Sequence, residues 1–213
     1  MPRTPDPATR TRILDAADRL LVRHGFRRMT IDGVAGEAGI GKGSVYLHFD
    51  SKEDVALSCI DRMADAVVAR LEAIAASGAP APERLREMLR ARVLLRFDYA
   101  RRHAASIDEK LAVMRQALLE RRAAHFEAEA VVLGRVVAEG RAAGTLAPGW
   151  DAPGRALVTA TNALLPYSLS VLELGHRAGL VRRTDEVVGL LLAGLAAPVS
   201  QNRPSKPRSR RNP

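Results

Sequence analysis

The spacing of apolar residues along the chain is helical from its first turns. Apolar residues return every three or four positions, as one face of an amphipathic helix requires, and the first such stripe contains Ile13, Leu14, Ala17, Leu20 and Leu21. Asp6 followed by Pro7 is a helix-start signal, because the carboxylate caps free backbone N–H groups and proline suits the first helical position. Gly25 fits the end of this helix, since glycine tolerates the left-handed conformation found there.

Two short helices joined by a glycine turn follow. Thr30 is the expected N-cap of a helix that Gly39 ends, and a second helix is expected over residues 42–49. The small core between them is expected from Val34, Ile40, Val45 and Leu47. This arrangement is a helix-turn-helix, whose second helix can enter the major groove of DNA. The second helix exposes four side chains suited to that contact, Lys42, Ser44, Tyr46 and His48.

The rest of the chain predicts longer helices and no strand. Ser51, with Asp54 three residues on, forms a capping box that opens a helix to about Ala76. Beyond a Pro- and Gly-rich loop, helices are expected at about 83–103, 107–142, 152–175 and 184–197, with loops at 144–153 and 175–179. A break near Leu111 is an open alternative. The fold class is therefore all-α, with an N-terminal three-helix helix-turn-helix domain and a C-terminal helical domain.

Composition narrows the class of protein. The 213 residues are 47% hydrophobic and 27% charged, which is typical of a globular chain. Cys59 is the one cysteine, so no internal disulfide is possible, and no Cys/His spacing fits a zinc site. We expect no metal and no cofactor. The polar N-terminus is not a signal peptide, and the apolar run at 187–199 is too short to span a membrane, so a cytoplasmic protein without a membrane partner is expected.

The net charge of +9 suits a polyanionic partner, and part of it is local. The segment 198–213 contains five of the cations and no acid, so a disordered basic tail is expected. It is either an additional DNA-binding arm or a solubilising end. An enzyme is not expected, because the sequence contains no nucleophile elbow, phosphate-binding glycine loop, metal cluster or catalytic triad.

The helix-turn-helix stretch resembles a known family. Residues 30–53, TIDGVAGEAGIGKGSVYLHFDSKE, are similar to the DNA-binding signature of the TetR/AcrR family of repressors. The preceding helix matches too, at Ile13, Ala16, Ala17, Leu20, Gly25 and Phe26. The resemblance covers roughly residues 8 to 55, and beyond it only the number and length of the helices agree.

The resemblance implies a homodimer that binds double-stranded operator DNA. It implies a DNA-binding domain at 1–52, a helical effector-binding and dimerisation domain at 53–197, and release from the operator by a small-molecule effector. Thr30, Tyr46, His48 and Lys52 fall where family members contact phosphates, and Lys42, Gly43 and Ser44 where they meet bases. Arg10 and Arg12 are possible additional contacts. The alternative is a small-molecule sensor with weak or vestigial DNA binding, which the helix-weakening glycines at 33, 36 and 41 favour.

Cations interrupt the apolar faces of two later helices. Arg92, Arg96 and His103 lie within the apolar face at 83–103, and Arg122, His125 and Glu129 interrupt the next stripe. Buried cations are costly unless they are paired. One interpretation is a pocket for an acidic or aliphatic effector; the other is an ion pair such as Arg96 with Glu129, or arginines that extend to solvent. The candidate effector-binding residues are Arg92, Arg96, Tyr99, His103, His125 and Asn162.

The last two long helices are candidates for the dimer interface. The segment 156–174 is apolar on two sides, which indicates contact with both a core and a partner, and a plain monomer core is the alternative. The final helix has the same character, with small residues at Gly189, Ala193 and Gly194. Pro166 is expected to kink the first of these helices or to end it.

Overall fold

The computed structural model describes residues 6–165 and 175–196, except for the side chains of 105–113. In these ranges the chain forms helices and no named strand, which confirms the all-α fold class. The helices are α1 (Pro7–Arg28), α2 (Ile31–Ala38), α3 (Lys42–Tyr46), α4 (Lys52–Ala75), α5 (Ala81–Arg102), α6 (Ala104–Ala142), α7 (Pro153–Asn162) and α9 (Arg177–Leu195). The predicted tail at 198–213 and the kink at Pro166 lie outside the described residues.

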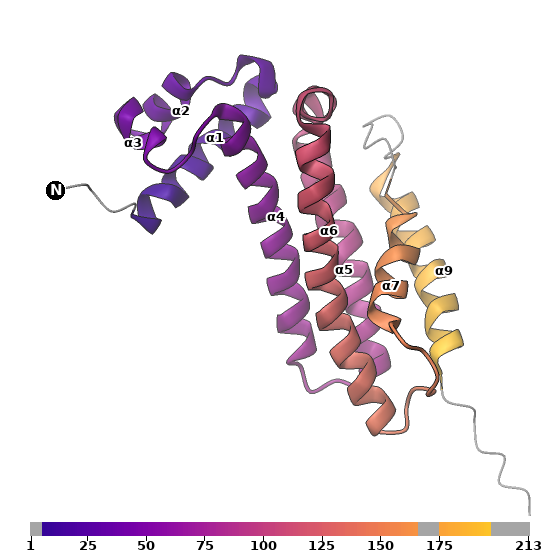
Figure 1. Cartoon of the computed structure of the whole chain (residues 1–213). Helices are drawn as coiled ribbons and strands as arrows, with labels where there is room; N and C mark the ends of the chain where they lie inside the picture. The colour runs from indigo at the N-terminus through magenta and orange to yellow at the C-terminus, as the bar shows by residue number, and fades with distance from the viewer. Residues whose placement is uncertain (1–5, 166–174, 197–213) are drawn as a thin grey trace, which may run out of the picture.

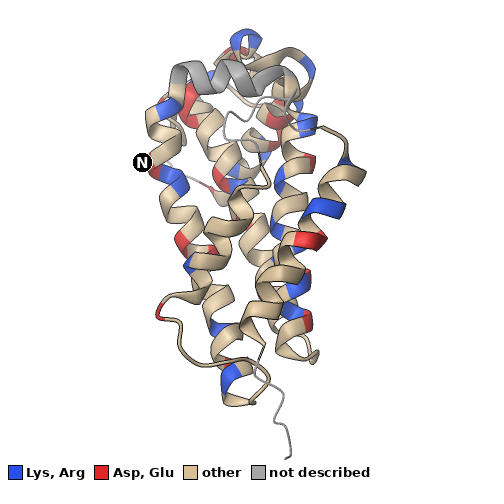
Figure 2. Cartoon of the chain, turned by 90° about the vertical axis from the view of Figure 1, so that its right-hand side faces the viewer, with Lys and Arg blue, Asp and Glu red and all other residues tan. Residues whose placement is uncertain are grey.

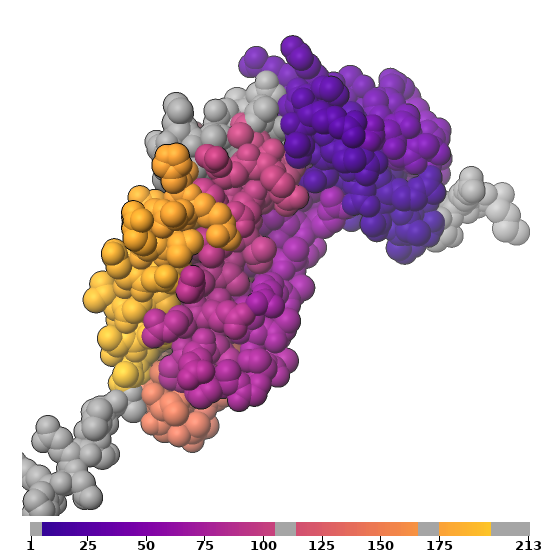
Figure 3. Space-filling view, turned by 180° about the vertical axis from the view of Figure 1, so that it is seen from behind, coloured from indigo at the N-terminus to yellow at the C-terminus, as the bar shows by residue number. Residues whose placement is uncertain are grey.

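The helices form a head and a body. Helices α1, α2 and α3 make a small head at one end, and α4, α5, α6, α7 and α9 run lengthwise as the body (Figure 1). Seen from behind, the head stands out from one end of the body, and α9 covers the side away from it (Figure 3). Long helix α4 belongs to both parts, since it leaves the head and continues down the body.

The head has its own hydrophobic core, which the body completes. Its buried residues include Phe26 of α1, Val34 of α2, Val45 of α3 and Phe49. The same cluster includes Met114 of α6 and four residues from the start of α4, which are Val55, Ala56, Leu57 and Cys59. The boundary placed after residue 52 stays a prediction, because α4 crosses it without a break.

The body is a second core in which two glycines allow close helix contact. A Cβ on Gly154 of α7 would lie 2.0 Å from the backbone oxygen of Ala130 in α6, so only glycine fits without a shift. A Cβ on Gly140 would lie 2.6 Å from Leu146. The core around them is built from aliphatic side chains of α4, α5, α6, α7 and α9. Charged residues lie mostly on the outer faces of these helices (Figure 2).

The predicted helix ends are largely confirmed. The side chain of Asp6 accepts from the N–H groups of Ala8 and Thr9, and Thr30 accepts from Gly33. Gly25 has φ of +77° inside α1, so the helix breaks there and resumes for one turn. Ser51 caps α4 through the N–H of Asp54, but the carboxylate of Asp54 accepts from Asp50 instead of closing a capping box on Ser51.

Four predicted boundaries differ from the structure. α7 ends at Asn162 instead of continuing to 175, because Leu165 precedes a proline and the chain tightens into turns, with Leu164 bonded to Thr161. α9 begins at Arg177, inside the expected loop 175–179, and this extension buries Leu180. α5 begins at Ala81, because Pro82 fits a first turn. The irregular residue of α6 is Met114, at φ −120°, three residues beyond Leu111.

No helix within the described ranges is both long and apolar enough to cross a membrane.

Candidate nucleic-acid interface and the polar clusters behind it

The head presents α3 on its outer surface. Val45 is fully buried and fixes α3 against the rest of the head, while Gly39, at φ +66°, ends α2 and turns the chain toward α3. Gly41 is the N-cap residue, as its position implied. Lys42 and Gly43 are exposed, Tyr46 is 50% exposed, and Ser44 and His48 are half-buried. The residues predicted to meet bases, Lys42, Gly43 and Ser44, thus follow one another in the first turn of α3.

Two apolar residues of the motif behave differently. Phe49 is buried in the head core. Leu47, predicted to be in the same core, is 52% exposed, because α3 ends at Tyr46 and the chain turns there. Ile40 is only partly buried, packing on the edge of the cluster.

Lys42 is paired within the head. Its Nζ lies 2.8 Å from Oδ2 of Asp32 on α2, and both side chains are more than half exposed. The hydrogen bond with the Asp32 carboxylate raises the pKa of Lys42, so the ammonium group stays charged. An exposed pair of this kind contributes little to stability, and its charge can be transferred to another anion at small cost.

Lys52, at the start of α4, turns toward α1. Its Nζ lies 3.4 Å from the carbonyl oxygens of Phe26 and of Met29 and 3.5 Å from that of Arg27, and it lies 4.5 Å from the centre of the Phe26 ring. A cation at these carbonyls complements the negative end of α1. The side chain therefore joins α4 to α1 in this structure.

Arginines of α1 hold the first helix of the motif. Arg19 donates to Glu37 at 2.6 Å, and Arg23 pairs with the same carboxylate at 3.4 Å. Arg12 donates to the carbonyl of Ala38 at the end of α2. Sequence reasoning missed these contacts, although Arg19 and Arg23 are four residues apart and so share a helix face. Arg10 lies over the Phe49 ring at 5.1 Å.

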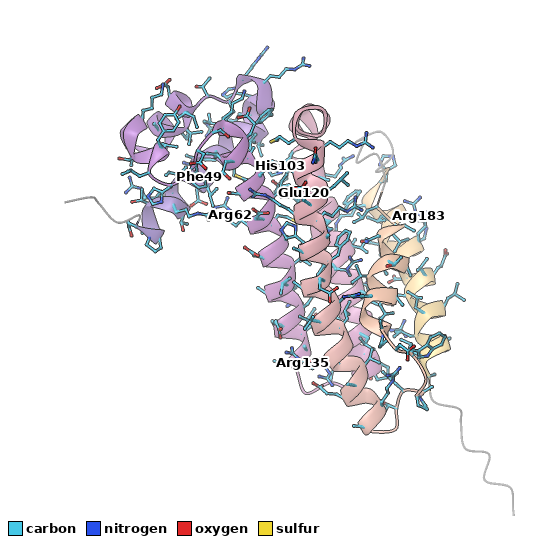
Figure 4. The ribbon with its side chains drawn as sticks, in the orientation of Figure 1. Phe49, Arg62, His103, Glu120, Arg135 and Arg183 are labelled. Carbon is cyan, nitrogen blue, oxygen red and sulfur yellow. The ribbon has the colours of Figure 1, made fainter. Side chains whose placement is uncertain are left out.

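The head meets the body through ionic contacts as well as through its apolar core. Asp18 of α1 receives a hydrogen bond of 2.9 Å from the buried ring of His103, which stacks on Tyr99 with ring centres 4.0 Å apart. Asp15 pairs with Arg62 of α4 at 2.5 Å. Figure 4 labels Arg62 and His103 where the head adjoins α4 and α5.

A further ionic cluster joins α4 to α6. Arg121 pairs with Asp61 and, at 3.4 Å, with Asp54. His125 lies 3.0 Å from the Asp61 carboxylate. The predicted effector residue His125 is thus part of a contact between two helices of the body.

The most buried polar group is the guanidinium of Arg92, which is fully enclosed. Its Nε donates to Glu129 at 2.7 Å, and its other nitrogens donate to Thr161, to Asn162 at 2.9 Å and to the carbonyl of Val158. Burial lowers the pKa of Arg92. Arg96 donates to both oxygens of Glu129, so the predicted ion pair between Arg96 and Glu129 is confirmed.

The candidate effector residues therefore fall into three places. Arg92, Arg96 and Asn162 share the buried cluster, Tyr99 and His103 lie at the junction with the head, and His125 pairs with Asp61. A separate open pocket of about 350 Å³ lies between the end of α5 and the start of α9, and none of the candidates lines it. Its lining residues are Phe97, Asp98, Arg101, Arg102, His176 and Arg177.

The sequence and the fold both match known proteins. Residues 13–59 match the family model described as bacterial regulatory proteins, tetR family. The chain is 37% identical over 83 residues to the transcriptional repressor KstR2 of Rhodococcus jostii, which is 35% of this chain but only 41% of that repressor. The match therefore spans less than half of that curated relative.

Two solved structures have folds similar to this one over most of the chain. One is from work on the molecular basis by which bacterial hormones control antibiotic production. It is 28% identical with a TM-score of 0.65, and the match covers 90% of this chain and all of that one. The transcriptional regulator FadR of Bacillus subtilis, in complex with stearoyl-CoA, is 20% identical with a TM-score of 0.61, covering 87% and 98%. At 20% identity, the similarity to FadR shows a similar fold only.

Proposed function

Since the chain belongs to the tetR family of bacterial regulatory proteins, we propose that it is a sequence-specific DNA-binding transcriptional regulator, a repressor that a small-molecule effector releases from its operator. The observation that carries the proposal is the exposed face of α3. Lys42 and Tyr46 project from a helix that Val45 and Gly39 fix on the head. A short, well-anchored and exposed helix of this kind is what major-groove recognition needs.

The residues of the head divide into two roles in this proposal. Lys42, Gly43 and Ser44 read base edges, where a lysine can donate to guanine and a glycine permits close approach. Thr30, Tyr46, His48 and Lys52 contact phosphates and set the register of the head on the duplex. For Lys52, DNA contact requires the ammonium group to leave the carbonyls of α1 or to share its donors with a phosphate.

A homodimer through α7 and α9 completes the regulator. The two helices lie on the same side of the body (Figure 1). Their exposed residues include small and apolar ones. Leu190 of α9 is 76% exposed, and Ala156, Ala163, Ala193 and Gly194 are exposed beside buried neighbours. A two-fold dimer presents two copies of α3 to a near-palindromic site.

The effector is proposed to carry an acidic group on an aliphatic chain. Arg92 and Arg96 share a single carboxylate, Glu129, so this cluster holds more positive than negative charge. FadR of Bacillus subtilis, with a similar fold, was solved with stearoyl-CoA, a ligand of that chemistry. Arg96, with 11% of its side chain exposed, is the better placed of the two to reach a ligand. Calorimetry with a long-chain acyl-CoA should give binding that Arg96→Ala weakens; tight binding of neutral aromatics that ignores this change would contradict the proposal.

The proposed function is tested by DNA binding across a salt series. Purified protein is titrated onto fragments of its own promoter region, with wild type compared with the double variant Lys42→Ala/Tyr46→Ala. We expect salt-sensitive, sequence-selective binding that the variant loses by at least about tenfold. Arg135→Ala is the matched control, since Arg135 pairs with Glu72 at the far end of the body (Figure 4).

Equal and weak binding of every fragment by wild type and variant would contradict the proposed function. That outcome favours a small-molecule sensor whose DNA binding is vestigial.

A further inference from the structure

The end of α5 places a histidine against the head. His103 is the residue after the last turn of α5, and its side chain is completely buried. Its Nδ1 lies 2.9 Å from the carbonyl oxygen of Tyr99, and its Nε2 lies 2.9 Å from Oδ1 of Asp18 on α1. The ring is therefore held at both nitrogens, one by the body and one by the head.

Both oxygens facing the ring act as acceptors. A backbone carbonyl can only accept, and so can an ionised carboxylate. The hydrogen bond from His103 lowers the pKa of Asp18, against the opposing effect of burial, so Asp18 is ionised at neutral pH. Both hydrogen bonds of the ring are satisfied only when both nitrogens carry a proton, which makes the ring an imidazolium cation paired with a carboxylate.

The surroundings of this pair are also ionic. Besides His103 and Asp18 themselves, the titratable or charged groups that act on Asp18 or Tyr99 include Arg62 and Cys59 of α4 and Arg102 of α5. Asp15, one turn before Asp18, is paired with Arg62. Helices α1 and α5 otherwise touch little, so the pair of Asp18 and His103 is a principal link between them.

We propose that His103 is a positioning residue for DNA binding, whose imidazolium form ties the head to the body through Asp18. The inference rests on the proposed function, because it concerns the orientation of α3 toward the operator. A dimer binds two half-sites at a fixed separation, so each head must be held at a defined angle to its body. The Asp18–His103 link supplies part of that constraint by joining α1 directly to the end of α5.

Loss of one proton breaks the link in a defined way. A neutral ring can donate from only one nitrogen, so either the Asp18 or the Tyr99 hydrogen bond is lost, and the charge attraction to Asp18 disappears. The head then samples more orientations, and part of the binding free energy is lost in fixing its orientation on the DNA. DNA affinity is therefore expected to be lower when the ring is neutral than when it is an imidazolium.

The test uses the full chain and operator DNA. The unaltered chain is the parent, and every protein compared keeps His48, because it is a proposed phosphate contact. We compare this parent with His103→Gln, Asp18→Asn and the pair of changes together, at about pH 6 and pH 8. We expect each of the three variants to bind about tenfold more weakly than the parent at pH 6. The double variant should be no weaker than the single ones, because they remove the same link. His24→Gln, an exposed imidazole on α1, should behave as the parent.

A second readout needs no DNA. Nitrogen-15 shifts of the His103 ring in the full chain should report protons on both nitrogens at about pH 6. Because this measurement is made first on the unaltered chain, it tests the proposal even if a variant fails to fold.

The outcomes are separable. If the parent binds its operator selectively but His103→Gln and Asp18→Asn bind as tightly as the parent at both pH values, the positioning role is overturned and the proposed function stands. A ring that carries a single proton at about pH 6 also overturns it. If no protein binds any DNA selectively, both proposals fail, whatever the NMR titration shows.

Discussion

The ammonium group of Lys52 lies 4.5 Å from the centre of the Phe26 ring, beneath the last carbonyls of α1. This lysine begins α4, and Phe26 follows the break at Gly25, so the contact links the end of one helix to the start of another. In sequence terms Lys52 has an unfavourable position, because a cation opposes the positive end of the helix dipole. The contacts of Lys52 with the carbonyls and the Phe26 ring of α1 offset this unfavourable interaction.

Lys52 and Lys42 are expected to respond differently to the same substitution. Lys52→Met should lower the free energy of unfolding by about 1–2 kcal/mol, because it removes charged hydrogen bonds and a cation–π contact. Lys42→Met should change it by less than about 0.5 kcal/mol, since its pair with Asp32 is exposed. Denaturant unfolding of both variants measures the difference. Equal losses would mean that Lys52 has no special structural role.

Gly36→Ala is expected to stabilise the head. A Cβ at this position in α2 has no atom within 4 Å, so the change adds helix propensity without a clash, about 0.5–1 kcal/mol. Thermal unfolding should show a higher midpoint with operator affinity kept. A loss of affinity without loss of stability would show instead that flexibility at this glycine is needed for docking.

Gly154→Ala is expected to be strongly destabilising. The added carbon would lie 2.0 Å from the carbonyl oxygen of Ala130, and a backbone atom cannot turn aside as a flexible side chain can. Moving α7 off α6 should cost about 1–3 kcal/mol or more. Gly134→Ala, in α6 with open space around it, is the control and should be neutral or stabilising. If both variants unfold at the same denaturant concentration, the close contact of α6 with α7 is not as described.

Glu129→Gln should destabilise the body far more than Glu127→Gln. Glu129 is fully buried and is the shared partner of Arg92 and Arg96, so its neutralisation leaves two cations poorly compensated, at about 3–5 kcal/mol. Glu127 lies two residues earlier and pairs with Arg155 on the exposed surface, where about 0.5 kcal/mol is expected. Calorimetric unfolding of the two variants tests this. A small effect at Glu129 would indicate that water or an effector already compensates the arginines.

The contribution of Asp18 to stability should depend on pH in a defined direction. Its pKa is lowered in the folded chain, so the stabilisation is present above the ordinary carboxyl pKa and is lost as pH falls through the lowered value. Asp18→Asn should cost up to about 1 kcal/mol near pH 6, because solvent screens part of the interaction. The difference from wild type should shrink as pH falls through the lowered pKa of Asp18 and vanish below it. A difference that persists in acid would point to packing instead of charge.

Sequence reasoning located the parts of the fold that local chemistry determines. Asp6, Thr30 and Ser51 act as caps because a short oxygen-bearing side chain before an apolar stripe has few other roles. The pairing of Arg96 with Glu129 was among the alternatives because both charges interrupt apolar faces, and such groups require a partner.

The parts that were missed depend on distant residues. Asp18 and His103 are 85 positions apart, and nothing local in either sequence segment indicates the other. Lys52 points toward α1 because of the carbonyls of Phe26 and Met29, which only the folded head brings near. α7 is shorter than its apolar stripe suggested, and the local signal for an early end was Pro166, which was expected either to kink this helix or to end it.

Met114 lies in α6 yet packs with the core of the head. The head is therefore not a self-contained cassette that could be exchanged between regulators at a cut after α3. A chimaera that joins residues 1–60 to a foreign body would leave an apolar hole where Met114 belongs, unless the new α6 supplies a side chain of similar size. Grafting this DNA specificity onto another protein means transplanting a patch of α6 together with the head.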